Sequence, residues 1–379
     1  MKLSIRKDAL NEAISHVSKA ISSRTAIPIL SGIKLDAAST GLTLTASDTD
    51  ISIQSFISLS KGEQTLITLD KEGSVVLPAK FFVEIVKKLP SEYVELEVFD
   101  QFRTLIRSGS AEIELVGLDP EEYPILPRLE EDKMFTINGQ VLKAMIRQTV
   151  FSVSNNESTP ILTGVLWNLN EGRLKFVATD RHRLASTEAD IDTAADLKLE
   201  HLVIAGKTLN ELSKIVADDV MVDIVATDNQ ILFKMDAIML YSRILDGTYP
   251  DTSKIISQSY KTELVVQTDR LTDAIDRAYL LSREEKTNIV KLVTIDSGTI
   301  EISSSSSELG KVTEQLEVKR LDGDELKISF NSKYMLDALK VIDSDHIHIG
   351  FTGMMSPIII RPEEDQSMLH LILPYRTTT

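Results

Sequence analysis

Few side chains in this sequence could do chemistry, and none of them falls into the spacing of a known catalytic motif. The chain contains no P-loop, no G-x-G-x-x-G, no G-x-S-x-G and no H-E-x-x-H segment. It contains no cysteine, which excludes disulfides, thiolate zinc sites and thiol catalysis and fits a reducing cytoplasm. We therefore expect a protein that has no catalytic activity and needs no cofactor or metal.

The weaker candidates for chemistry have simpler interpretations. His346-Ile-His348 places two imidazoles on one face of a strand, but no third metal ligand is near in sequence, which favours an exposed strand face. Asp48, Asp50 and Asp180 could act as metal-binding or acid–base carboxylates. They lie in expected turns, however, where aspartate accepts hydrogen bonds from nearby backbone amides.

Two other segments indicate binding rather than catalysis. Thr179–Leu184 is a dense polar cluster that equivalent turns of the chain lack. The apolar C-terminal segment His370–Arg376, together with Met354, Met355 and Pro357, could form an adaptable binding surface. Core packing is the alternative interpretation of these Met and Leu residues.

A helix with one pattern occurs three times, at Ala79–Leu89, Gly206–Val216 and Ser332–Ile342. Each copy has a lysine, an acid four residues later and a second lysine seven residues later. Apolar residues stand two, five and nine positions after the first lysine. At 100° per residue, the charged and apolar sets lie on opposite faces, so each copy is an amphipathic helix.

A second helix also recurs, at Ile5–Ile21, Ile137–Val153 and Val266–Leu281. The loop Ile27–Ile33 that follows it returns as Thr159–Val165, and a strand pair with an acidic turn comes next. In the third copy the serine run Ser303–Ser307 takes the place of that turn, and we expect it to be a flexible polar turn.

The period of about 126 residues is a domain length, too long for a solenoid repeat. Alternating stretches such as Tyr93–Val98 and Ala111–Val116 predict half-buried antiparallel strands. We therefore predict an α+β fold of three tandem copies at 1–128, 129–257 and 258–379, each with two helices packed on antiparallel sheets.

The charge of the chain is unevenly distributed. The formal net charge is −16 and the pI about 4.9, which taken as a whole disfavours nucleic acid and anionic membranes as partners. The six helix windows 6–20, 80–89, 138–154, 207–216, 269–283 and 333–342 nevertheless carry a net charge of +7, which leaves −23 for the rest of the chain. Three equivalent basic faces could therefore line one surface. The charged N-terminus and the lack of a long apolar run lead us to expect neither a signal peptide nor a membrane span.

Four segments together resemble the bacterial sliding clamp, the β subunit of DNA polymerase III, in the form found in low-GC Gram-positive bacteria. These segments are Arg24–Leu30, Thr179–Leu184, Asp246–Asp251 and Leu373–Arg376. The resemblance covers essentially the whole chain. It implies a head-to-tail homodimer, a ring with pseudo-sixfold symmetry whose helices surround duplex DNA without reading its sequence. It further implies a cytoplasmic processivity factor in replication and repair, without catalytic activity, that tethers DNA polymerases and is handled by a clamp loader.

The resemblance also assigns site residues. A partner-peptide pocket would comprise Thr159, Ile161, Leu162, Thr179, Arg181, His182, Arg183, Leu184, Pro250, Ile255, Asn331, Tyr334, Met355, Pro357, Leu371, Leu373, Pro374, Tyr375 and Arg376. Contacts with DNA would come from Arg24, Lys80, Arg147 and Lys207. The dimer interface would join Ile113 and Leu115 to Leu280 and Leu281.

Two positions depart from the family pattern. Position 181 is Arg, where many relatives have a small residue, and Ile161 replaces an aromatic residue that some relatives carry. A three-domain protein-interaction scaffold that uses the same pocket without encircling DNA is the alternative function.

Overall fold

The computed structural model describes residues 1–22, 25–126, 129, 134–194, 196–257, 259–284 and 287–376. Arg24, one of the expected DNA contacts, and the expected boundary at residue 128 lie outside the described residues. Within them the chain divides into two compact units, residues 1–140 with 211–244 and residues 141–210 with 245–379. We describe each unit by itself.

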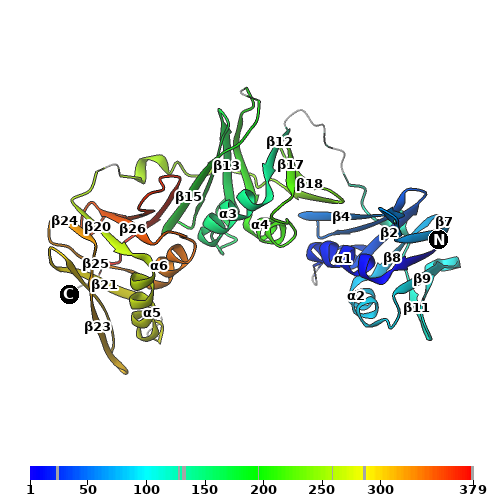
Figure 1. Cartoon of the computed structure of the whole chain (residues 1–379), viewed down its shortest axis with the longest axis horizontal. Helices are drawn as coiled ribbons and strands as arrows, with labels where there is room; N and C mark the ends of the chain where they lie inside the picture. Colours follow the sequence, from blue (N-terminus) through cyan, green and yellow to red (C-terminus); the bar gives the residue numbers. More distant parts are fainter. Residues whose placement is uncertain are drawn as a thin grey trace. The chain divides into compact units, whose positions relative to one another are not determined.

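All strand pairs in both units are antiparallel, as expected from the alternating sequences. The first unit holds the sheet β11-β10-β9-β1-β7, the sheet β12-β17-β18-β19-β4-β3-β2-β8 and the small hairpin β5-β6 (Figure 1). The second unit holds the sheet β16-β13-β14-β15-β28-β27-β26-β20-β24 and the sheet β23-β22-β21-β25.

The strands have the following bounds. In the first unit they are β1 (Lys2–Arg6), β2 (Gly32–Ala38), β3 (Gly41–Ser47), β4 (Ile51–Ser58), β5 (Ser60–Lys61), β6 (Gln64–Thr65), β7 (Ile67–Lys71), β8 (Gly73–Pro78), β9 (Tyr93–Val98), β10 (Arg103–Ser108), β11 (Ala111–Val116), β12 (Met134–Asn138), β17 (Met221–Ala226), β18 (Gln230–Met235) and β19 (Ile238–Arg243). In the second unit they are β13 (Gly164–Asn170), β14 (Arg173–Thr179), β15 (Arg183–Asp190), β16 (Leu199–Ala205), β20 (Thr262–Gln267), β21 (Ile289–Asp296), β22 (Thr299–Ser306), β23 (Gly310–Glu317), β24 (Arg320–Gly323), β25 (Lys327–Asn331), β26 (His346–Phe351), β27 (Ile358–Pro362) and β28 (Met368–Ile372).

The two largest sheets each continue from one copy of the repeat into the next. In the first unit, β19 of the middle copy pairs with β4 of the first copy. In the second unit, β15 of the middle copy pairs with β28 of the third copy, with Arg183 opposite Ile372 and Thr187 opposite Met368. The middle copy therefore contributes four strands to the largest sheet of each unit.

The α-helices of the described residues are α1 (Lys7–Val17), α2 (Ala79–Lys88), α3 (Gly139–Thr149), α4 (Gly206–Ser213), α5 (Thr268–Glu284) and α6 (Ser332–Leu339). Short 3₁₀ turns extend α1 and α3, at η1 (Ser18–Ala20) and η5 (Val150–Ser152). Five of these six helices fall within a segment predicted from the repeat, and α5 begins within its predicted segment but continues three residues past Leu281, to Glu284. In the first unit α1 packs against α2 and on β3 and β4, and in the second unit α5 packs against α6 and on β21 and β22.

The amphipathic pattern predicted for α2, α4 and α6 is confirmed. The apolar positions are buried at Phe82, Leu89, Leu209, Leu212, Val216, Met335, Ala338 and Ile342, and Ile85 is half-buried. The first lysines of the three helices, Lys80, Lys207 and Lys333, are exposed. Burial of one apolar stripe against the sheets therefore holds each of these short helices in place.

The expectation of a flexible turn at Ser303–Ser307 is wrong. Ser303–Ser306 belong to β22, which pairs with both β21 and β23. Three of these serines are buried, and the Ser304 hydroxyl donates a hydrogen bond of 2.6 Å to the carbonyl of Ala278 on α5. Small hydroxyl side chains let the helix approach the sheet closely, so a polar run here packs as a strand.

Candidate functional site

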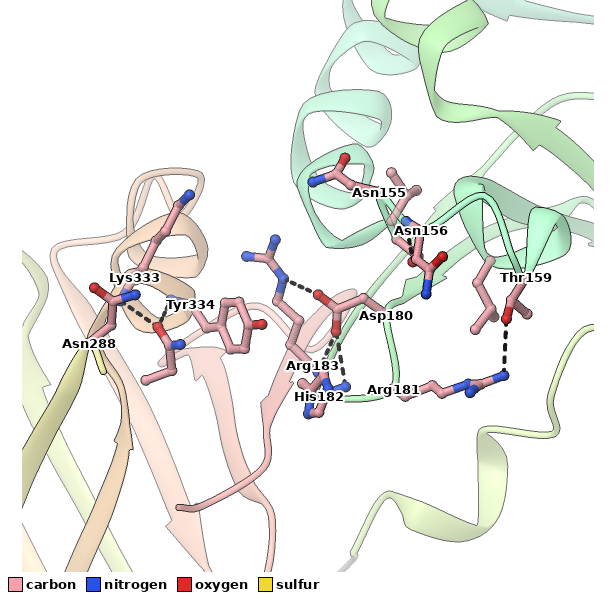
Figure 2. A pocket seen from close by; sticks show the side chains of 14 residues that line it. Asn155, Asn156, Thr159, Asp180, Arg181, His182, Arg183, Asn288, Lys333 and Tyr334 are labelled. Atoms are coloured by element: carbon pink, nitrogen blue, oxygen red, sulfur yellow. Dashed lines mark hydrogen bonds and ion pairs between the residues drawn. The ribbon is translucent and has the colours of Figure 1, made fainter. Parts of the chain in front are cut away.

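The second unit contains a pocket of about 640 Å³ where the middle copy meets the third (Figure 2). Its lining consists of Val153, Ser154, Asn155, Asn156, Thr159, Leu162, Asp180, Arg181, His182, Arg183, Asn288, Asn331, Lys333 and Tyr334. Seven of these are among the predicted partner-peptide residues: Thr159, Leu162, Arg181, His182, Arg183, Asn331 and Tyr334. Segments far apart in the sequence thus converge on one cavity.

A tight turn between β14 and β15 forms the centre of the pocket. Asp180 Oδ1 accepts hydrogen bonds from the backbone amides of His182 and Arg183, each at 3.0 Å. The Thr179 hydroxyl donates to the carbonyl of Arg183 at 2.7 Å and accepts from the amide of Arg181 at 3.2 Å. These bonds hold Arg181 at φ 76°, a left-handed conformation that is uncommon for a residue other than glycine. Asp180 is thus a structural turn residue, as its position in a turn suggested.

Arg183 joins this turn to the third copy. Its side chain is 10% exposed, and its guanidinium pairs with Asp180 Oδ2 at 3.0 Å and with Asp337 Oδ2 on α6 at 2.6 Å. The same group donates to the carbonyl of Phe151 at 2.6 Å and stacks 4.4 Å above the Tyr334 ring. One planar cation therefore satisfies partners from three elements, which suits the fork geometry of arginine.

Leu162 connects the pocket lining to a buried apolar cluster. Ile161, Leu162, Leu184 and Leu371 belong to it, so these predicted pocket residues are mainly core residues. Tyr249 closes the cluster, with its hydroxyl accepting from the Thr179 amide at 3.1 Å, and burial raises its pKa.

His370 on β28 is fully buried beside the Phe151 ring, at 5.6 Å between ring centroids. Burial lowers its pKa to about 3, so the imidazole is neutral at neutral pH. The His370 imidazole therefore adds no positive charge to the core of the second unit.

The third copy provides the opposite wall through the start of α6. Asn331 caps this helix, since its Oδ1 accepts from the amides of Lys333 and Tyr334 at 3.0 and 3.2 Å. Figure 2 shows Lys333 and Tyr334 on one side of the Asp180–Arg183 pair and Arg181 on the other. The predicted residue Asn331 thus positions its neighbours in addition to lining the cavity.

The C-terminal segment is attached to both walls. The amide of Leu373 donates to the carbonyl of His182 at 2.9 Å, and the amide of Tyr375 donates to the carbonyl of Ser329 at 2.7 Å. Leu373 and Tyr375 are 38% and 51% exposed. Their side chains are therefore available at the surface although their backbone is held.

The remaining predicted pocket residues do not line this cavity. They lie on loops or on the C-terminal segment and are exposed or half-buried: Pro250, Ile255, Met355, Pro357, Pro374 and Arg376. Conversely, the lining includes Asn155, Asn156, Asn288 and Lys333, which the sequence analysis did not assign to the pocket. Lys333 was visible as the first lysine of the repeated helix, but only the fold places it beside the turn.

Other predicted residues have partners of their own. Arg147 forms an ion pair with Asp343, and His348 Nε2 lies 2.8 Å from Glu263 Oε2. Among the described residues, no group of three or more histidine or acidic side chains is arranged to hold a metal. In the same part of the chain, no helix has both the length and the apolar character needed to cross a membrane.

Comparison with known proteins accounts for this architecture. Family models of the DNA polymerase III beta subunit match the N-terminal domain at residues 1–127, the central domain at 136–251 and the C-terminal domain at 253–376. The chain belongs to the DNA polymerase III beta subunit family. The resemblance seen in the sequence is confirmed.

Members of this family that resemble the chain include two Gram-positive beta sliding clamps. The beta sliding clamp of Bacillus subtilis is 51% identical over 378 residues, and that of Halalkalibacterium halodurans is 48% identical over 379, each covering 100% of both chains. The crystal structure of the Bacillus subtilis sliding clamp matches with a TM-score of 0.97, covering 100% of this chain and 99% of that one. The DNA polymerase III beta chain of Streptococcus pneumoniae matches with a TM-score of 0.95 at 36% identity, covering 99% and 100%.

Membership in the sliding clamp family identifies the function of the chain. It is a processivity factor of the replicative DNA polymerase and a non-catalytic subunit of the holoenzyme. The alternative of a scaffold without a role on DNA is not favoured. The three copies seen in the sequence are the three domains of the family.

Proposed function

We propose that two copies of this chain close head to tail into a ring around duplex DNA and slide along it without reading its sequence. Replicative and repair polymerases would bind the pocket described above and would thereby be tethered to DNA. The clamp loader, which opens the ring, would bind the same pocket. Membership in the sliding clamp family is the observation that carries this proposal. The same proposal places the chain in the cytoplasm, where bacterial DNA is replicated.

The proposed dimer joins two sheet edges. The strand β11 is the free edge of its sheet, with Ile113 and Leu115 half-buried on one face, and β23 is the free edge of a sheet in the second unit. An unpaired edge presents backbone donors and acceptors to a second chain. Leu280 and Leu281 at the end of α5 would then cover the apolar face of β11 from the partner copy, and Leu280 is 50% exposed.

The proposed DNA contacts are the exposed lysines at the start of the repeated helices, Lys80 and Lys207, with Arg24 and Arg147. Contacts to phosphate position a protein without carrying sequence information, which suits a ring that slides. Arg147 would contribute less because Asp343 already compensates its charge. The negative charge of the strands and loops would discourage DNA from binding to other surfaces.

The proposed peptide site extends beyond the cavity. The apolar residues Met355, Leu373 and Tyr375 are more than one-third exposed and would add apolar contacts to those inside the pocket. A few buried apolar anchors of the partner would supply most of the affinity. We also propose domain bounds of 1–128, 129–257 and 258–379; the family models match 1–127, 136–251 and 253–376, so the third match begins five residues before the proposed bound.

A topology assay tests the ring directly. We expect the protein, once loaded by a clamp loader, to stay on nicked circular DNA during gel filtration and to be lost when the circle is cut. The matched control is the same DNA after cutting, with a protein bound at each end, because the blocked ends should keep the ring on the linear DNA. Equal loss from circular and linear DNA would contradict encirclement. It would instead favour the alternative function, a protein-interaction scaffold that does not encircle DNA.

Removal of residues 373–379 tests the C-terminal part of the peptide site. We expect it to weaken binding of a polymerase peptide at least about tenfold, since a lost anchor costs about 2 kcal/mol or more. The truncation removes the Leu373–His182 and Tyr375–Ser329 backbone bonds as well as two apolar side chains. Fluorescence anisotropy measures the affinity, and sedimentation checks that the dimer remains. A chain that lacks only residues 377–379 is the control, and unchanged affinity in the longer truncation would refute the assignment.

A further inference from the structure

The turn at Asp180 has a close counterpart in the first copy, at Asp48. The two turns share a backbone conformation but differ in the side chains that follow the aspartate. In the first copy Asp48 Oδ1 accepts from the amides of Asp50 and Ile51 at 3.2 and 3.0 Å. Thr49 has φ 82°, close to the 76° of Arg181. The same backbone turn therefore forms with Thr49-Asp50-Ile51 as with Arg181-His182-Arg183.

The cationic side chains of the second turn are consequently not needed to build it. Arg183 has a structural use, since it joins the turn to α6 through Asp337. Arg181 has no such use. Its side chain is exposed, and within the described residues it makes one side-chain hydrogen bond, of 3.3 Å from Nη2 to the Thr159 hydroxyl.

Arg181 and Lys333 are cations of the pocket whose charge is not compensated locally. Within the described residues, neither has a carboxylate within ion-pair distance, whereas the pocket's own carboxylate, Asp180, is paired with Arg183. The two cations lie on opposite sides of that pair (Figure 2). A pocket of this kind stands out in a chain whose formal net charge is −16.

We propose that Arg181 selects partner peptides that carry an acidic side chain beside their apolar anchors, with Lys333 supporting a second carboxylate at the other end of the pocket. This inference rests on the proposed peptide-binding function of the pocket and names the class of peptide. A guanidinium pairs with a carboxylate through two parallel hydrogen bonds, and Arg181 would exchange its weak bond to Thr159 for such a pair.

A peptide is the better ligand than nucleic acid because part of the mostly polar lining is apolar, at Leu162, Val153 and the Tyr334 ring. Anchor side chains of a peptide can pack against this part of the lining, whereas a DNA backbone offers it no apolar group. Competition by an oligonucleotide is nevertheless included below, since phosphate could also pair with Arg181.

The test uses the full-length protein and two short fluorescent peptides with the same leucine and phenylalanine anchors, one with a neighbouring Asp and one with Asn in its place. For the wild-type protein at low salt, we expect the Asp peptide to bind about three- to fivefold more tightly, the range of an exposed ion pair. The preference should shrink in high salt, because screening weakens exposed pairs.

Arg181→Gln is the decisive variant, because it removes the charge and keeps a non-glycine residue at the left-handed position. We expect it to abolish the preference for Asp, so that the Asp and Asn peptides bind this variant with equal affinity. Arg181→Lys should restore part of the preference. Arg173→Gln is the matched control, because Arg173 lies at the far end of the same strand β14 and pairs with Asp190.

The outcomes separate the inference from the function on which it rests. Equal binding of the two peptides to the wild-type protein, or a preference that survives in Arg181→Gln, overturns the inference alone. Binding of neither peptide overturns the pocket assignment and the inference with it. Displacement of the Asp peptide by a single-stranded oligonucleotide from the wild type, but not from Arg181→Gln, would show that the cation serves nucleic acid and would also overturn it.

Discussion

Replacing Ile113 and Leu115 together with aspartate is expected to convert the proposed dimer into a monomer and to abolish retention on circular DNA. Both side chains are half-buried on one face of the edge strand β11, between the exposed acids Glu112 and Glu114. Two further carboxylates would be buried against Leu280 and Leu281 of the partner copy without a counter-charge. An unpaired buried charge costs about 3–5 kcal/mol, so we expect the dimer dissociation constant to rise at least about a hundredfold.

Sedimentation velocity over a concentration series measures this change. Val116→Asp is the matched control, since Val116 lies on the same strand but on its opposite face and is 67% exposed. It should leave the dimer intact. The double variant should keep its fold, because β11 is an edge strand and neither side chain is in the core. A double variant that stays dimeric at nanomolar concentration would refute the interface.

Replacing Arg183 with methionine is expected to lower the free energy of unfolding by about 3 kcal/mol, the scale for removing one partner of a buried ion pair. The variant keeps much of the side-chain volume but leaves Asp180, Asp337 and the Phe151 carbonyl without their shared donor. Two carboxylates that were neutralised would then face each other near the pocket. Peptide affinity should fall as well, because the turn and α6 lose the group that holds them together.

Urea unfolding followed by circular dichroism measures the loss, and a second variant identifies its cause. Adding Asp337→Leu to Arg183→Met should recover part of the stability, because it removes one of the carboxylates left unpaired. Arg173→Met is the control, since Arg173 is 60% exposed and solvent screens its pair with Asp190, so its loss should change the free energy of unfolding little. A loss below 1 kcal/mol for Arg183→Met would mean that the network does not hold the two domains together.

Local patterns predicted much of the fold. The stripe of apolar residues around Phe82, Leu209 and Met335 located three helices, because burial on one side of a helix repeats with the period of the helix itself. The turn aspartates Asp48 and Asp180 were assigned correctly, since their hydrogen bonds reach only two or three residues along the chain. The same reasoning wrongly predicted a turn at Ser303–Ser306. These serines are buried because α5 packs against them, and a contact so distant in sequence leaves no local pattern.

The candidate site was predicted unevenly. The polar segment Thr179–Leu184 stood out in the sequence, and the family resemblance placed it in a pocket. The lining residues Asn155, Asn288 and Lys333 were missed, since they come from separate segments that meet only in the folded chain.

The sequence by itself determined the threefold repeat, the amphipathic helices and the segregation of basic helices from acidic strands and loops. These are properties of residue order and period, and they need no knowledge of distant contacts. Only the tertiary structure decided that β19 joins β4 and that β15 joins β28, so that each large sheet crosses from one copy to the next. Backbone hydrogen bonds between strands are similar for every sequence, so the partner of a strand depends on the packing of whole layers. That packing brings Arg183 to Asp337, 154 residues away, and leaves Arg181 with a hydrogen bond to Thr159 but without a carboxylate partner among the described residues.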